Sequence, residues 1–160
     1  MGAGVDDKFD GLLQSLGKIA QKHAKSVVES ILRWRRSQLE GTELQRSQYS
    51  VKAVRALDST AIVAERKMLT STYIMCRALV IATKDISKES LGESVGNSLE
   101  EMTFEQFRRP DHKMLTQSVN HRAIADLYAV LLGNLTEIRY AFIFIVMFCF
   151  LLIFLEDLNL

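Results

Sequence analysis

The sequence is poor in the residues that interrupt or cross-link a chain. It has a single proline, Pro110, and two cysteines, Cys76 and Cys149, among 160 residues. A chain so poor in proline can form long helices, because proline breaks a helix in its interior. Two cysteines, each inside an apolar stretch, cannot build a disulfide framework and indicate packed thiols in a reducing compartment.

The sequence also lacks the motifs that carry chemistry. Its three histidines, His23, His112 and His121, are far apart and have no His or Cys partner at ligand spacing, so we expect no metal site. It has neither a Gly-rich phosphate loop nor a Gly-x-Ser-x-Gly turn. A formal net charge of +1 is not typical of a nucleic-acid-binding domain. We therefore predict a protein that is not an enzyme, with no cofactor, small-molecule substrate or nucleic-acid partner.

Apolar residues at three- and four-residue spacing predict two helices at the N-terminal end. The first apolar stripe comprises Phe9, Leu12, Leu13, Leu16, Ile19 and Ala20, and the second runs from Val27 through Ile31 to Trp34. Asp6 or Asp7 can cap the first helix. The connector at 23–25 is so short that the two helices should form an antiparallel hairpin.

The same periodicity predicts further helices along the chain. It fades over residues 37–50, where Gly41 and Thr42 indicate a loop. It returns from Val51 to Ile81, with a break near Asp58, and the stretch 73–82 is apolar almost all round and should be buried. Another helix from Leu91 should end before the proline at 110. After a connector at 111–118, a last helix is expected over 120–139, with the stripe Ile124, Leu127, Tyr128, Leu131, Leu132, Leu135 and Ile138.

These patterns predict an all-α protein of five to seven helices. No stretch alternates apolar and polar residues long enough for a half-buried strand. The paired elements indicate HEAT- or armadillo-like helical hairpins or an irregular helical bundle. We expect one helical domain over residues 1–139 and an apolar C-terminal helix within a tail over 140–160.

The tail contains an uncharged run at residues 140–155. As a helix this run is about 24 Å long, shorter than a typical hydrocarbon core of about 30 Å and closer to the roughly 27 Å of thin membranes. Two interpretations stay open: insertion in a membrane, or burial in the core or at an interface. In either case the segment would make its contacts through Tyr140, Phe142, Phe144, Phe148, Phe150 and Phe154.

One basic cluster surrounds an aromatic residue, in the sequence Arg33, Trp34, Arg35, Arg36. It can contact the acidic face of a partner protein. The alternative is that Trp34 docks on a neighbouring helix and leaves the arginines in solvent.

Several strings resemble the N-terminal region of the Furry/Tao/Mor/Pag cell-morphogenesis proteins. They begin with the segment 9–20, which reads FDGLLQSLGKIA, followed by VVESILRWR at 27–35. STYIMCRAL at 71–79, FEQFRRPD at 104–111 and the segment 120–139 resemble later helices of the same region. The resemblance covers about residues 9–139.

Members of that family are very large helical-repeat scaffolds that support NDR-type kinases and their Mob coactivators in polarised growth. The resemblance therefore implies a non-catalytic scaffold with protein partners, in the cytoplasm and at the cell cortex or sites of polarised growth. The alternative function is a small tail-anchored membrane protein whose helical body faces the cytosol.

Overall fold

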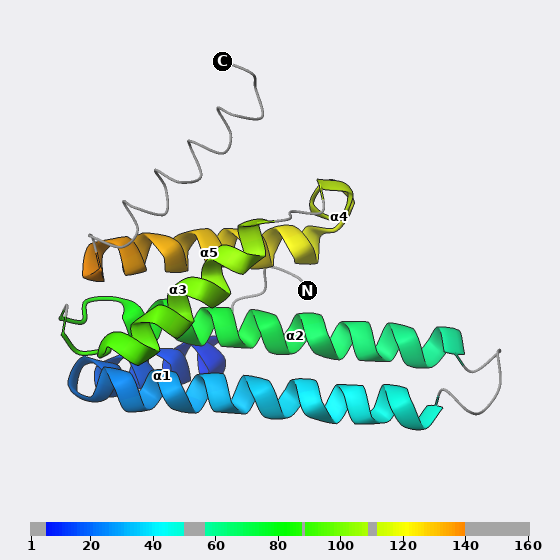
Figure 1. Cartoon of the computed structure of the whole chain (residues 1–160), viewed down its shortest axis with the longest axis horizontal. Coiled ribbons are helices and arrows are strands. Elements are labelled where there is room, and N and C mark those ends of the chain that lie inside the picture. Colours follow the sequence, from blue (N-terminus) through cyan, green and yellow to red (C-terminus); the bar gives the residue numbers. More distant parts are fainter. Residues whose placement is uncertain (1–5, 50–56, 88, 109–111, 140–160) are drawn as a thin grey trace, which may run out of the picture.

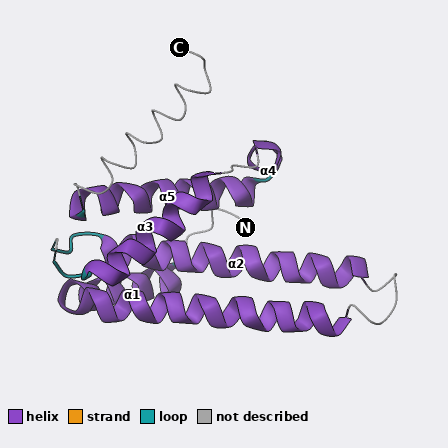
Figure 2. Cartoon of the chain, viewed as in Figure 1, coloured by secondary structure: helices purple, strands orange, loops and turns teal. Residues whose placement is uncertain are grey.

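The computed structural model describes residues 6–49, 57–87, 89–108 and 112–139. Within these ranges every regular element is an α-helix and no strand occurs, which confirms the all-α prediction (Figure 2). The helices are α1 (Asp7–Tyr49), α2 (Leu57–Thr83), α3 (Glu93–Arg108), α4 (His112–Gln117) and α5 (Val119–Ile138). None of the helices in the described part of the chain is long and apolar enough to cross a membrane.

Helix α1 is divided into two arms by a kink at His23, whose backbone has the non-helical angles φ −136° and ψ 43°. The carboxylate of Asp6 caps the first arm by accepting a hydrogen bond from the backbone N–H of Phe9 at 3.1 Å. In Figure 1 the chain reverses direction at this kink, so the predicted helical hairpin and its cap are confirmed.

The two arms of α1 pack on α2 in opposite directions. In the first arm, Asp10 forms an ion pair with Arg77, and Gly17 lies beside Ile81, so this arm runs the same way as α2. A Cβ atom at position 17 would lie 2.8 Å from Cγ2 of Ile81, so glycine permits this close approach. The second arm runs back along α2, where Arg35 reaches its middle turns.

The predicted loop at Gly41 and Thr42 is wrong, because α1 continues as a helix to Tyr49. A glycine inside a helix costs only about 1 kcal/mol relative to alanine. Helix-forming residues on both sides, such as Glu40 and Leu44, offset that cost. The predicted break near Asp58 does not occur within α2, which begins at Leu57; the stretch expected from Val51 onward lies partly outside the described residues.

Helix α5 packs on the other side of α2, and α3 and α4 pack on α5 (Figure 1). The core joins these elements through Met75 and Leu79 of α2, Leu99 of α3 and Leu131 and Leu135 of α5, all almost completely buried. The last predicted stripe is confirmed, since its members are buried or half-buried. Residues 73–82 are likewise all buried or half-buried, as their apolar pattern predicted.

Two predictions about local structure need correction. The stretch 111–118, expected to be a connector, contains the short helix α4. The first apolar stripe is only partly buried: Leu13 and Ala20 are in the core, but Leu12 and Ile19 are 69% and 53% exposed. The repeat-like stacking of hairpins and the fold of the tail over 140–160 stay predictions, and the tail lies outside the described residues.

Candidate functional site

An apolar recess of about 510 Å³ lies between the two arms of α1 and the adjacent face of α2. Helix α1 contributes most of its wall. The lining residues are Leu16, Ile19, His23, Ser26, Val27, Ser30, Ile31, Trp34, Ile74, Met75 and Ala78.

Small side chains keep this recess open. Ser26 and Ser30 lie one turn apart on the second arm, and the Ser30 hydroxyl donates to the Ser26 carbonyl at 2.7 Å. Ala78 contributes only a methyl group from α2. Because the kink at His23 turns the first arm back, Leu16 and Ile19 of this arm line the same recess as the second arm.

A second recess of about 580 Å³ adjoins the first, and Trp34 and Ile74 line both. Its remaining wall is more polar and includes the cationic side chains Arg66 and Lys67. The other lining residues are Ser37, Gln38, Gly41, Val63, Thr70 and Ser71. We call the two recesses together the α1–α2 groove, with an apolar half and a basic half.

The basic cluster of the second arm is divided by the structure. Arg33 and Arg36 are exposed, and Trp34 lies at the centre of the groove with 36% of its surface exposed. Arg35 points inward and donates to the hydroxyls of Ser71 and Thr72 at 2.9 and 2.8 Å. The four side chains therefore do not share one surface, and partner contact by this cluster stays a prediction.

Behind Arg35, a buried polar contact joins α2 to α5. The Tyr128 hydroxyl and the Cys76 thiol lie close enough to influence each other's titration, and burial raises the pKa of Cys76 to about 12. Burial also lowers the pKa of the Arg35 guanidinium and raises that of the Tyr128 hydroxyl. A thiol with so high a pKa stays protonated at neutral pH, so Cys76 is packed in the core and unsuited to act as a nucleophile.

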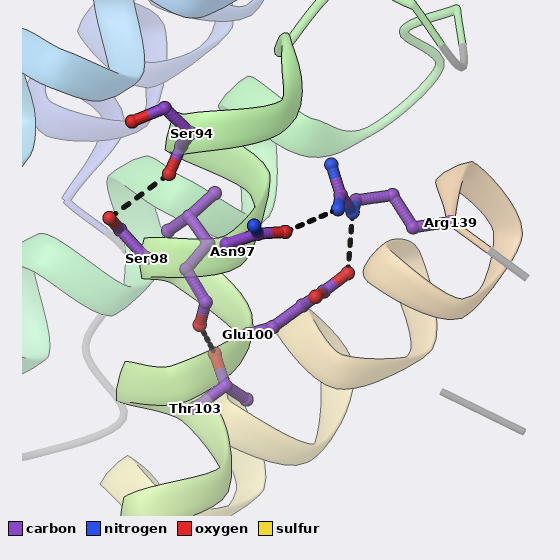
Figure 3. A network of polar contacts seen from close by, with 7 residues as sticks. Ser94, Asn97, Ser98, Glu100, Thr103 and Arg139 are labelled. Atoms are coloured by element: carbon purple, nitrogen blue, oxygen red, sulfur yellow. Dashed lines mark hydrogen bonds and ion pairs between the residues drawn. The ribbon is translucent and has the colours of Figure 1, made fainter. Parts of the chain in front are cut away.

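A second polar cluster joins α3 to the end of α5 (Figure 3). Arg139 donates from Nε to Oε1 of Glu100 and from Nη2 to Oδ1 of Asn97, both at 2.6 Å. Glu100 is completely buried, its second carboxylate oxygen has no hydrogen-bond partner, and burial raises its pKa. Gly96 lies directly under the Arg139 side chain. We call these four residues the Glu100–Arg139 clasp.

Sequence reasoning missed the clasp because its partners are 39 residues apart and no local spacing connects them. Among the described residues no group of three His, Cys, Asp or Glu side chains is placed to hold a metal ion. The aromatic residues expected to make contacts in the tail, from Tyr140 to Phe154, lie outside the described part of the chain.

Comparison with known proteins gives one consistent relationship. Residues 65–144, half of the chain, match the family described as cell morphogenesis N-terminal. The cell polarity protein mor2 of Schizosaccharomyces pombe is 26% identical to this chain over 140 residues. The cell morphogenesis protein PAG1 of Saccharomyces cerevisiae is 22% identical to it over an alignment of 225 residues.

Each alignment covers 88% of this chain but only 6% of mor2 and 9% of PAG1, so the chain spans a small fraction of these relatives. No solved structure matches it significantly. The family match covers α5 and most of α2, and it includes all of α3 and α4. The chain therefore belongs to the cell morphogenesis N-terminal family.

Proposed function

We propose that this chain is a non-catalytic docking segment of a cell-morphogenesis scaffold, which supports NDR-type kinase and Mob complexes during polarised growth. Family membership carries the morphogenesis role. The open α1–α2 groove supports a role in protein contact. The corresponding location is the cytoplasm, at the cell cortex or at sites of growth.

The exposed side chains of the second arm of α1 suit a docking surface. Aromatic and arginine side chains dominate the binding energy of many protein interfaces. Trp34 lies within the groove, and Arg33 and Arg36 project from the same helix into solvent. Arg35 contributes differently, because its guanidinium bonds to α2 and so stabilises the arm that carries the other three.

This division decides which variant tests the proposal. A double charge reversal, Arg33→Glu with Arg36→Glu, changes only exposed side chains and should leave the circular dichroism spectrum unchanged. In a pull-down with the chain as bait, we expect the wild-type chain to retain a purified NDR-type kinase–Mob complex and this variant not to retain it. Arg35 is left intact, since its reversal would bring a carboxylate against the packed face of α2.

A matched control is Lys8→Glu with Lys84→Glu, which reverses the same amount of charge on exposed side chains outside the cluster. This control should retain the kinase–Mob complex. Equal retention by wild type and the Arg33/Arg36 variant would rule out this surface as the contact.

A further inference from the structure

We propose that the α1–α2 groove binds an amphipathic helix of a partner protein, with an apolar stripe along one half of the helix and acidic residues along the other. The inference rests on the proposed scaffold function and specifies the chemistry of the partner. It joins three observations: an apolar recess, an adjoining basic recess, and an excess of positive charge on α1, which forms one wall of both.

The apolar half of the groove faces away from the packed core. Ala78 lines it, whereas Cys76 and Val80, two residues away on either side, contact α5. Two residues correspond to about 200° around a helix, so the groove lies on the side of α2 opposite α5. Ile19 and Trp34 thereby expose apolar surface that the other described helices do not cover.

Positive charge is in excess on α1 and on the wall of the basic half of the groove. Residues 18–40 hold six basic side chains and two acidic ones, a formal charge of +4 in a chain whose total is +1. The basic half adds the exposed guanidinium of Arg66 from α2. A partner with carboxylates opposite these groups gains attraction and faster association, whereas a basic partner is repelled.

The dimensions of the groove suit a helix. Along the second arm of α1 its lining extends from His23 to Gly41, 18 positions further along the chain, or about 27 Å of helix. An occupant of about five turns would match that length, and helices laid into apolar grooves are a recurrent mode of recognition. A concave surface formed by two helices favours a convex helical partner over a flat lipid surface.

The experiment uses Trp34, the only tryptophan of the chain, as a reporter inside the groove. The full chain is titrated with an 18-residue helical peptide that has leucines on one face of its first half and glutamates over its second half. We expect the fluorescence emission of Trp34 to shift to shorter wavelength as the peptide covers it. The same peptide with lysine in place of glutamate should bind at least tenfold more weakly.

Two variants and two matched controls locate the binding. Ile19→Glu in the apolar half and Arg66→Glu in the basic half should each weaken binding at least tenfold, with circular dichroism unchanged. Val130→Glu on α5 is the control for Ile19→Glu, because the two side chains are similarly exposed, at 50% and 53%. Lys84→Glu is the control for Arg66→Glu, because it reverses an exposed charge outside the groove. Both controls should bind as wild type does.

Four results would overturn the proposal. The first is no spectral shift with the acidic peptide, and the second is equal binding of the lysine peptide. The third is a shift with phosphatidylserine vesicles but not with the acidic peptide, which would assign the surface to a membrane. The fourth is protection of the Trp34 fluorescence from quenching by acrylamide in the chain without peptide. Protection at every protein concentration would assign the groove to another segment of this chain. Protection that grows with protein concentration would assign it to a second copy of the chain.

The outcome is separable from that of the kinase–Mob experiment. Peptide binding without any retention of a kinase–Mob complex would support the groove and contradict the proposed partner. Retention of the kinase–Mob complex that depends on Arg33 and Arg36, together with no peptide binding, would support the proposed partner and contradict the groove as a helix-binding site.

Discussion

Replacing Gly96 with alanine should destabilise the protein, although alanine is the better helix former. A Cβ atom at position 96 would lie 2.1 Å from Nη1 and 2.5 Å from Cζ of Arg139, closer than any contact allows. Arg139 is 19% exposed and can swing toward solvent to relieve the clash. That movement would leave the carboxylate of Glu100, which is completely buried, without its counter-ion.

The magnitude follows from two opposing terms. Alanine in place of glycine inside a helix gains about 1 kcal/mol. Removal of one partner from a buried ion pair costs about 3–5 kcal/mol, because the remaining charge is uncompensated. The net loss should therefore be about 2–4 kcal/mol, a substantial part of the 5–15 kcal/mol typical of a whole domain.

Urea unfolding, followed by circular dichroism at 222 nm, measures this loss as a lower midpoint. The matched control is Gly133→Ala on α5, where the added Cβ would have no atom within 4 Å beyond its chain neighbours and its own helix backbone, so about 1 kcal/mol should be gained. In the double variant Gly96→Ala/Glu100→Gln a neutral amide replaces the buried charge, and much of the loss should be recovered. Equal stabilisation by Gly96→Ala and Gly133→Ala would refute the reasoning.

Three further predictions concern the core, the clasp and the tail. Leu131→Asp should abolish the cooperative thermal melt, because it buries an unpaired carboxylate at a completely buried position; a wild-type-like melt would contradict the packing. The raised pKa of Glu100 means that the folded state holds this proton more tightly than the unfolded state, so its contribution to stability falls as pH rises from about 4.5 through the folded pKa. Melting temperatures of wild type and Glu100→Gln from pH 4 to 7 should show that extra decline in wild type alone. Deleting residues 140–160 should leave the helical body folded and raise its solubility, whereas unfolding of the whole domain on truncation would show that the tail belongs to the core.

Local patterns predicted the helices where one face is buried against a neighbour. The stripe from Ile124 to Ile138 defined α5 almost to the residue, because each fourth or third side chain meets the same core. The carboxylate of Asp6 marked the start of α1 for a similarly local reason. Local patterns were misleading at Gly41, where the helix continues because an exposed glycine costs less than its flanking residues gain.

The candidate site was only partly accessible to sequence reasoning. The local sequence shows Arg33 to Arg36 as a basic cluster around an aromatic residue, yet nothing local shows that Arg35 turns toward Ser71 and Thr72 while Arg33 and Arg36 stay in solvent. The helical pattern of α1 shows which residues share a face, but not how far an adjacent helix covers that face. Ile19 therefore belonged to an apolar stripe and was still left at the edge of a groove.

The sequence by itself determined the helical class, the break between two helices at residues 23–25 and the family relationship, since these depend on the order of residues along a few turns. Only the tertiary structure decided the α1–α2 groove and the Glu100–Arg139 clasp. Both arise between helices, where the angle of packing determines which side chains meet. The carboxylate of Glu100 on α3 is buried as part of an ion pair because α5 ends beside it and brings Arg139 within reach. The apolar stripe of α1 forms one wall of a groove because α2 covers it only in part.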